Sequence, residues 1–420
     1  MIIYNLFPRV SGKITEWEFH LEHIKNMGFT HVYINPIFEI GYSKSLYAAK
    51  NFKKIDEIFV DTFSEFMPFE QLKNFVDKAH LLGLKVIFEM IFTHTAIDSD
   101  MLIEHPEWYR YENGNLKKFS FKENDRWQEW GDLIELDNDE SGKNTGLWEY
   151  WIEIIEMYIA AGADGFKCEA AYKVPREMWN YIIGNIKKKN KDIVFVADNL
   201  GAGFSEMLDL TGAGFDYMFT SLKWWDFSST WFLEQHYKLK DLVKLISFPE
   251  SSETGRLAEI YSGKAAASKA WYGFASLFNT GSMMPIGYEY GCKNRLDVIN
   301  SFEEDLDERT MDITLFITEI NKIKKEYKLF NSECDIYFIN TSNPKVFIFK
   351  KVSIDKSEES LIIVNRNFDS EEKIYFGDLT YLFENKNLID ISPERKEENV
   401  KKEYSYTLTP GEIKIIYTKE

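Results

Sequence analysis

The residues best suited to acid–base chemistry stand where predicted strands end. The segment GFKCE (165–169) places Lys167 and Glu169 at the end of an apolar run, Asp198 follows IVFVA, and Glu253 follows LISF. An unpaired charge inside a protein costs several kcal/mol, so a buried strand stays apolar until it ends. These side chains therefore either form ion pairs or line a site.

Carboxyl groups in this arrangement suggest one kind of chemistry. Retaining glycoside hydrolysis uses two carboxyl groups about 5 Å apart, one as nucleophile and one as general acid and base. A single acid at a strand end is often only a helix N-cap or part of a surface ion pair. Three acids on one rim favour a site. Glu89, His94 and Glu250 fall on the same rim, although a lone histidine there is more often structural.

The elements that must position these residues alternate between strand and helix patterns over residues 1 to about 325. In the first helix pattern, Trp17, Leu21, Ile24 and Met27 recur at three- and four-residue spacing, and Gly28 ends it. Eight strand–helix units favour an α/β fold, a closed (β/α)8 TIM barrel, with its active site at the carboxyl ends of the strands. No glycine-rich phosphate fingerprint follows any strand, which weakens the alternative of an open dinucleotide-binding sheet. The predicted strands are 2–7, 31–35, 84–92, 164–168, 193–197, 215–219, 245–248 and 282–287.

Two segments depart from the alternation. Residues 95–146 are long, polar and rich in aromatic side chains, which is typical of an inserted subdomain. After about residue 329, apolar segments alternate with turn-like NTSNP, DSEE and TPGE, which predicts an antiparallel β module. We therefore expect a barrel from 1–94 and 147–328, a small inserted B domain at 95–146, and a C-terminal β-sandwich at 329–420.

Composition narrows the classes of partner. The net charge of −18 argues against nucleic acid or an anionic membrane and fits a neutral ligand. Aromatic residues make up 16% of the chain, an excess that suits a cleft for sugar rings, although each one alone is better explained as core. The three cysteines are far apart in the sequence and no run approaches the length of a membrane span, so we expect reduced thiols and a cytoplasmic protein.

Four segments carry a family resemblance: FEMIFTH (88–94), GFKCEAAYKVP (165–175), VFVADNLG (194–201) and SFPESSETGRLA (247–258). Together they resemble the α-amylase clan, glycoside hydrolase family 13, over nearly the whole chain. The similarity is greatest to short bacterial α-amylase or maltosyltransferase-like members. The resemblance implies a barrel, an inserted B domain and a C-terminal β-sandwich. It also implies activity on α-1,4-linked glucooligosaccharides.

The catalytic positions carried over from the family are altered here. Glu169 stands where the family has its aspartate nucleophile, and Asp198 where it has its glutamate acid/base. Glu253 replaces the third, transition-state-stabilising aspartate. Lys167 replaces the arginine two residues before the nucleophile, and Ser252 the histidine before the third acid. Lysine is expected to orient a carboxylate less well, because it lacks the planar fork of the guanidinium group.

The remaining positions concern substrate and metal. Glu89 and Thr93 replace the usual aspartate and asparagine of the first motif, while His94 is kept, as is Tyr47, which matches the sugar-stacking tyrosine of the family. We therefore expect Tyr47, His94, Lys167 and Ser252 to bind substrate. Thr93 offers only a hydroxyl where metal-bound relatives have a ligand, so we expect no required cofactor and regard Ca²⁺ as doubtful. The segment LDNDE (136–140) is better explained as a turn than as a Ca²⁺ site.

Two functions remain open from the sequence. One methylene moves a carboxylate by more than 1 Å, and catalytic groups must hold to about 0.5 Å, so the protein could be an impaired pseudoenzyme that binds α-glucan or a protein partner. However, all three acid positions still hold acids. Lengthening the nucleophile and shortening the acid could preserve their separation, which favours a working retaining hydrolase or transglycosylase.

Overall fold

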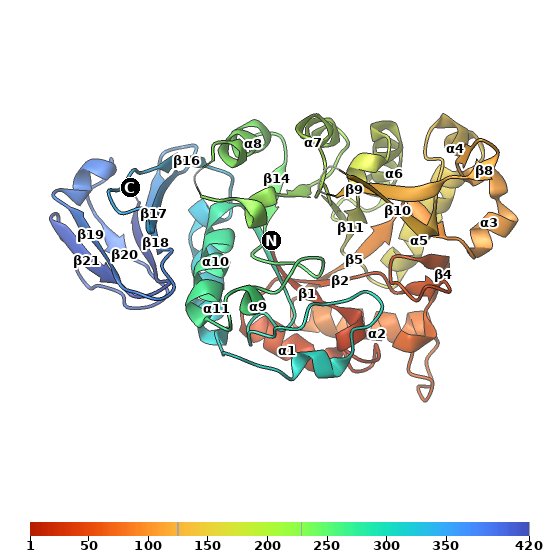
Figure 1. The fold of residues 1–420 in the computed structure, drawn as a ribbon, viewed down its shortest axis with the longest axis horizontal. Coiled ribbons are helices and arrows are strands. Elements are labelled where there is room, and N and C mark those ends of the chain that lie inside the picture. Colours follow the sequence, from red (N-terminus) through yellow and green to blue (C-terminus); the bar gives the residue numbers. More distant parts are fainter. Residues whose placement is uncertain (124–125, 228, 420) are drawn as a thin grey trace.

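In the computed structural model of the protein, the described residues are 1–123, 126–227 and 229–419. Figure 1 shows a central barrel, with an antiparallel domain (blue) on one side and a strand-rich insertion (orange) on the other. The C-terminal end of the chain lies in the antiparallel domain.

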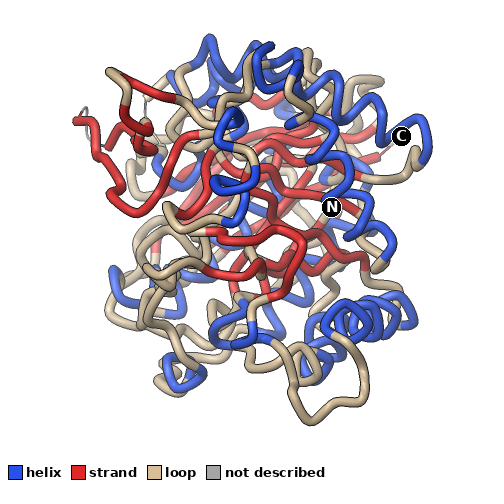
Figure 2. Tube along the Cα trace, turned by 90° about the vertical axis from the view of Figure 1, so that its right-hand side faces the viewer, coloured by secondary structure: helices blue, strands red, loops and turns tan. Residues whose placement is uncertain are grey.

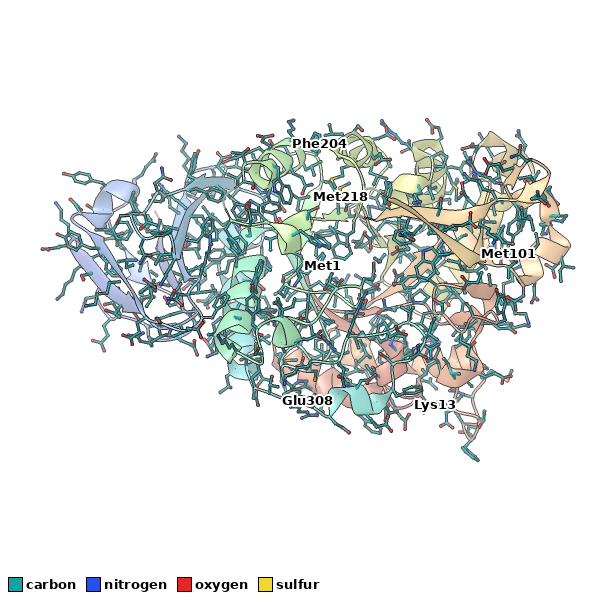
Figure 3. All side chains as sticks on the ribbon, viewed as in Figure 1. Met1, Lys13, Met101, Phe204, Met218 and Glu308 are labelled. Atoms are coloured by element: carbon teal, nitrogen blue, oxygen red, sulfur yellow. The ribbon has the colours of Figure 1, made fainter. Side chains whose placement is uncertain are left out.

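Eight parallel strands close into the barrel in the spatial order β1, β15, β14, β13, β12, β11, β5, β2. The predicted (β/α)8 barrel is confirmed, and each strand end lies within two residues of its prediction. The bounds are β1 Ile2–Leu6, β2 His31–Ile34, β5 Lys85–Ile91, β11 Gly165–Glu169, β12 Val194–Ala197, β13 Tyr217–Phe219, β14 Lys244–Ser247 and β15 Gly281–Pro285. Met218 of β13, labelled in Figure 3, is fully buried.

Helices flank the strands on both sides, as Figure 2 shows in blue and red. Gly28 and Gly83 follow α1 and α2 with positive φ of 85° and 71°, a conformation that glycine adopts without strain. None of the helices in the described ranges is long and apolar enough to cross a bilayer. The main helices are α1 Glu18–Asn26, α2 Pro68–Leu81, α5 Leu147–Ala160, α6 Arg176–Lys189, α7 Phe204–Thr211, α8 Trp231–Leu239, α10 Ala265–Phe278 and α11 Thr314–Glu326.

Between β5 and β11 the chain forms a second, antiparallel sheet of β6 (His94–Ala96), β10 (Arg126–Glu135) and β9 (Lys118–Glu123). Its backbone pairing brings His94 opposite Glu135. The hairpin of β3 (Phe38–Ile40) and β4 (Ala49–Ile55) was not predicted, because its polar strand AKNFKKI lacks an apolar run. Smaller elements of the insertion are α3 Asp100–Glu104, η3 Pro106–Trp108, β7 Tyr111–Glu112, β8 Asn115–Leu116 and α4 Glu140–Asn144.

The C-terminal region is antiparallel, as predicted. A five-stranded sheet has the order β16, β17, β18, β22, β20, and β19 pairs with β21. A separate apolar cluster lies between these strands, including Ile348, Leu361 and Ile416. The bounds are β16 Asp335–Phe338, β17 Val346–Val352, β18 Glu358–Asn365, β19 Glu372–Phe376, β20 Ile389–Asp390, β21 Tyr404–Leu408 and β22 Ile413–Lys419.

Two buried lysines join the C-terminal domain to the barrel at the carboxyl end of α10. Lys324 Nζ donates to the carbonyls of Ser276, Asn279 and Phe330, each at 2.7 Å. Lys351 Nζ, from β17, donates to two further carbonyls, those of residues 277 and 278, at 3.0 and 2.8 Å. The last carbonyls of a helix lack intrahelical partners, so these ammonium groups satisfy acceptors that would otherwise be buried without one.

Lys324→Met is therefore expected to destabilise the protein by about 3 kcal/mol, because it leaves buried carbonyls unpaired at about 1–3 kcal/mol each. The urea unfolding midpoint measures this change. Lys322→Met, an exposed position on the same helix, is the control and should leave the midpoint nearly unchanged. Equal midpoints for the two variants would contradict the assignment.

Candidate active site

The alternation of side chains along each strand determines which residues face the barrel interior. Successive strand residues point to opposite sides, so a residue two positions beyond an interior one is also interior. Ile87, Val196 and Tyr33 belong to a cluster at the barrel centre, and Glu89, Asp198 and Asn35 follow them by two residues. On β11, Lys167 and Glu169 are the corresponding pair. The same alternation thus continues beyond the apolar cluster. The interior side chains at the carboxyl ends of the strands are therefore polar.

The ammonium group of Lys167 lies at the centre of the polar cluster. It is 2.5 Å from Glu89 Oε1, 2.5 Å from Glu169 Oε2 and 2.6 Å from Asp198 Oδ2. Glu253 Oε1 lies further out, at 3.6 Å. Glu89 and Glu169 accept hydrogen bonds from this ammonium group, which has three N–H donors, while Asp198 and Glu253 form ion pairs with it. Lys167 and Glu89 are also register partners in the adjacent strands β11 and β5.

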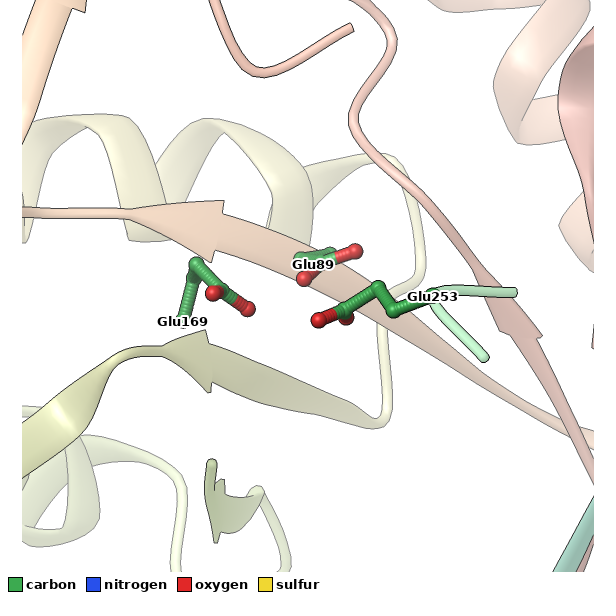
Figure 4. Close-up of side chains that lie close together, drawn as sticks. All are labelled: Glu89, Glu169 and Glu253. Carbon is green, nitrogen blue, oxygen red and sulfur yellow. The ribbon is translucent and has the colours of Figure 1, made fainter. Parts of the chain in front are cut away.

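The two predicted catalytic groups lie close together. Because Glu169 Oε2 and Asp198 Oδ2 both contact one nitrogen, their separation cannot exceed the sum of 2.5 and 2.6 Å, which is 5.1 Å. Glu169 has 19% of its side chain exposed and Glu253 39%, whereas Lys167 and Asp198 have 4% each. The ammonium group thus lies beneath Glu169 and Glu253, which reach the solvent. Figure 4 shows the carboxyl groups of Glu89, Glu169 and Glu253 directed toward one another.

Several polar residues that the sequence analysis did not select hold Glu89 in place. Tyr33 donates to Glu89 Oε2 at 2.5 Å, and Asn35 Nδ2 donates to the same oxygen at 2.9 Å. Asn35 is itself held by Asn5, whose Nδ2 donates to Asn35 Oδ1 at 2.7 Å. The signal was present in the sequence, since Tyr33 and Asn35 are two residues apart at the end of β2. A tyrosine and an asparagine at a strand end are too common to be selected without the strand order.

Burial and mutual repulsion shift the pKa values of the acids. Burial raises the pKa of Asp198 to about 6, although the charge of Lys167 opposes the shift. Burial likewise raises the pKa of Glu169 against the same opposing charge. The pKa of Glu253 is raised well above its ordinary value by desolvation and then by the charge of Glu169, although 39% of its side chain is exposed. Burial alone would lower the pKa of Lys167, but its carboxylate partners outweigh it and raise that pKa well above the ordinary value.

Other predicted residues lie in the wall of the site. Tyr47 donates its hydroxyl to Glu89 Oε2 at 3.2 Å. Both ring nitrogens of His94 are engaged, at 3.0 Å with the Tyr47 carbonyl and at 2.8 Å with the Thr93 hydroxyl. Burial lowers the pKa of His94 to about 4, so its ring is neutral and holds the backbone of Tyr47. Ser252 Oγ accepts from Asn35 at 3.3 Å.

Glu250 is not part of the Lys167 cluster. It accepts from Arg256 Nη1 at 2.9 Å and from the backbone N–H of Leu257 at 2.6 Å, and it is 1% exposed. Of the acids near the end of β14, Glu253 therefore reaches the cluster and Glu250 forms a buried ion pair.

Among the residues that the structure describes, neither the carboxylate cluster nor the cavity beside Thr93 fits a calcium ion. Oxygens of Glu89, Glu169 and Glu253 lie within 4.8 Å of one another, but the Lys167 ammonium already supplies their cation. The 210 Å³ cavity beside Thr93 is lined by three basic residues and one acid. Hard cations need several oxygen ligands and no adjacent positive charge. The lining residues are Thr93, Arg110, Lys117, Phe119, Ser120, Glu135, Leu136, Asn138 and Lys173.

We accordingly expect the melting temperature to stay within about 1 °C when the protein is treated with EDTA, since a protein without a bound metal gains nothing by metal linkage. Differential scanning calorimetry with and without chelator measures this. A large drop, restored by Ca²⁺, would overturn the expectation.

Comparison with known proteins gives sequence relatives and a shared fold. The family described as glycogen debranching enzyme, glucanotransferase domain, matches residues 1–115. An α-1,4-glucan:maltose-1-phosphate maltosyltransferase of Burkholderia pseudomallei is 24% identical over 343 residues, 77% of this chain and 29% of that protein. A cyclomaltodextrinase of Thermoanaerobacter pseudethanolicus is 21% identical over 384 residues, 86% of this chain and 64% of that protein. The chain thus spans less than two thirds of either relative. The crystal structure of an α-amylase from Lactobacillus plantarum matches with a TM-score of 0.76 at 19% identity, covering 99% of this chain and 98% of that one, which shows the fold.

Proposed function

We propose that the chain belongs to the α-amylase family, glycoside hydrolase family 13, and that it is a retaining glycoside hydrolase or transglycosylase acting on α-1,4-linked glucooligosaccharides. The observation that carries the proposal is the separation of at most 5.1 Å between oxygens of Glu169 and Asp198. Retaining enzymes hold their two carboxyl groups about 5–5.5 Å apart, and inverting enzymes hold them further apart.

In the proposed reaction, Glu169 attacks the anomeric carbon while Asp198 gives its proton to the glycosidic oxygen. The bond from the anomeric carbon to that oxygen breaks, and a glycosyl ester of Glu169 forms. Asp198, now a carboxylate, then takes a proton from water or from a sugar hydroxyl. The oxygen of that water or hydroxyl attacks the anomeric carbon, and the ester bond to Glu169 breaks. The raised pKa of Asp198, about 6, suits a group that must be protonated first and ionised later.

The positive charge of Lys167 lies beside both reacting carboxyl groups throughout the proposed reaction. Before the first step Glu169 is anionic and Asp198 protonated, whereas afterwards Glu169 is a neutral ester and Asp198 is anionic. Because one ammonium contacts both groups, it stabilises whichever is charged without moving far. Glu89, fixed by Tyr33 and Asn35, holds Lys167 in place. We propose that Glu253 and Ser252 bind sugar hydroxyls and that Tyr47 stacks on a sugar ring, with His94 contributing to binding by holding the Tyr47 carbonyl.

The test uses purified protein with maltoheptaose, followed by product chromatography and by NMR of the first anomer released. We expect turnover with retention of configuration, and its loss in Glu169→Gln. A 5-fluoroglycosyl fluoride should trap an ester on the peptide that contains Glu169, identified by mass spectrometry.

The competing function is a catalytically impaired protein that binds α-glucan or a protein partner. It is favoured by the bonding of Asp198, since Oδ1 accepts from the Leu200 N–H at 3.0 Å while Oδ2 contacts Lys167. Saturable glucan binding with no turnover above the Glu169→Gln control would establish it and exclude the hydrolase.

We propose a neutral α-glucan as the partner and the cytoplasm as the compartment. The net charge of −18 disfavours nucleic acid and anionic membranes as partners. The three cysteines are buried and unpaired, in keeping with a reducing compartment.

A further inference from the structure

A cavity of 270 Å³ lies where the barrel meets the C-terminal domain. We refer to it as the aromatic cavity. Five of its nine lining residues are aromatic, and they come from the segment after η5 (Ser221–Trp224), from α10 and the connection before it, and from the segment after β18. Its lining residues are Trp225, Asp226, Phe227, Tyr261, Ala270, Trp271, Val364, Arg366 and Phe368.

The aromatic cavity faces the same end of the barrel as the carboxylate cluster. In a (β/α)8 barrel each helix starts near the carboxyl end of the preceding strand, so the start of α10 lies on the catalytic face. The connection from β14 to α10 carries both Glu253 and Tyr261. Trp224, 54% exposed, has its ring edge-on to Phe248 just beyond β14, at 6.1 Å between centroids. Trp224, which precedes Trp225 of the cavity wall, therefore adds exposed aromatic surface beside the end of β14.

The rings of the aromatic cavity are arranged as walls and leave it open. Phe227 and Trp271 have centroids 5.0 Å apart at 60°, and Tyr261 and Phe368 have centroids 5.1 Å apart at 83°. Phe227, Tyr261, Trp271 and Phe368 are each only partly buried. Flat ring faces that stay partly open to solvent are suited to the C–H faces of a sugar ring.

Arg366 provides hydrogen-bond donors at the same place. It is half-buried, with its guanidinium 4.9 Å from the centroid of the Phe227 ring. Within residues 1–123, 126–227 and 229–419, no side chain accepts a hydrogen bond from this guanidinium, but the charge of Asp226 in the same cavity wall opposes the lowering of the Arg366 pKa by burial. A guanidinium group with five N–H donors thus lines the aromatic cavity beside the Asp226 carboxylate. Sugar hydroxyls would satisfy donors that an apolar occupant would leave unpaired.

The backbone at Phe227 adds an independent observation. Its φ is +62°, in the left-handed region that a bulky residue rarely adopts. Such conformations cluster at ligand clamps and active sites, where the surrounding structure holds them. Asp226 fixes the turn from its other side, accepting from the Ser229 N–H at 2.8 Å and from the Ser229 hydroxyl at 2.5 Å.

We propose that the aromatic cavity is a non-catalytic binding site for a glucosyl unit of an α-glucan chain, stacked on Trp271 and Tyr261 and hydrogen-bonded by Arg366. It would hold a part of the chain distant from the carboxylates, or a second chain. The proposal depends on the proposed function for the identity of the sugar, but it requires no turnover.

The experiment measures maltoheptaose binding by isothermal titration calorimetry in Glu169→Gln protein, so that turnover does not interfere. Adding Trp271→Ala should raise the Kd about tenfold, the loss expected for one stacked ring. Tyr261→Ala should act in the same direction, which keeps the test decisive if one variant fails to fold. Tyr381→Ala, an aromatic position 83% exposed in the C-terminal domain, is the matched control and should leave the Kd unchanged.

The outcomes separate the two proposals. Weakened binding in the Trp271 and Tyr261 variants supports the aromatic cavity even if the wild-type protein shows no turnover, in which case only the catalytic proposal fails. Turnover of maltoheptaose with a Kd unaffected by both variants overturns the cavity proposal and leaves the catalytic one standing. Absence of any maltoheptaose binding overturns the cavity proposal as well.

Discussion

Exchanging the two proposed catalytic side chains, as Glu169→Asp together with Asp198→Glu, is expected to give a more active protein than either single variant. Each single change should lower kcat/KM by about 10²–10³-fold, because a carbon–carbon bond of about 1.5 Å exceeds the tolerance of a catalytic pair. The pair now consists of a long nucleophile and a short acid that contact one ammonium. Glu169→Asp alone would open a gap, and Asp198→Glu alone would crowd the position of the scissile bond. The two substitutions together restore the combined length of the two side chains.

The measurement is a double-mutant cycle on kcat/KM with a maltooligosaccharide, and we expect the double variant to exceed either single variant by at least about tenfold. Glu326→Asp, an exposed position at the end of α11, controls for loss of a methylene elsewhere and should match the wild type. If the losses of kcat/KM in the two single variants simply added, as free energies, in the double variant, the two side-chain lengths would not compensate each other.

Much of the barrel could be predicted from the sequence because its strands are apolar runs separated by helix patterns. The same regularity places the site, since the period of two that buries Ile87 and Val196 also turns Glu89 and Asp198 inward. Lys167 and Glu169 follow the same rule on β11. Local pattern and the general position of active sites in this fold were therefore enough to bring these residues to one rim.

The contacts that hold the acids in place could not be predicted from the sequence, because they join segments that are far apart in the chain. Tyr33 and Glu89 are 56 residues apart, and Asn35 and Ser252 are 217 apart. Glu253 reaches the cluster from a connection whose conformation no strand pattern determines. The sequence does not distinguish Glu250 from Glu253 on that connection. The fold does, because it pairs Glu250 with Arg256.

The structure also changes the interpretation of Lys167. From the sequence it was expected to be a poorer substitute for arginine. In the fold, its compact ammonium group contacts three carboxylates at 2.5–2.6 Å and lies 3.6 Å from a fourth. A planar guanidinium binds carboxylates within its own plane, whereas an ammonium group directs its donors around one point. The altered acids and the lysine thus form one consistent set.

Lys167→Met is expected to lower kcat/KM by about 10²–10⁴-fold, because it removes the charge that stabilises the reacting carboxylates in a buried site. It should also move the pH dependence. The Lys167 charge holds down the pKa of both Glu169 and Asp198 against burial, so both pKa values should rise without it. Activity needs Glu169 ionised, which sets the acidic limb, and Asp198 protonated, which sets the alkaline limb. Both limbs of the kcat/KM profile should therefore shift to higher pH.

Profiles of kcat/KM from pH 4 to 9 test this, since they report the ionisations of the free protein. Lys167→Arg keeps the positive charge and should keep the wild-type limbs even if its rate falls. Lys85→Met, at the exposed amino end of β5, removes a lysine from the opposite end of the barrel and should change neither rate nor limbs. If the Lys167→Met profile coincided with that of the wild type, the ammonium group would not govern these ionisations. The charge partner of the reaction would then have to be another group.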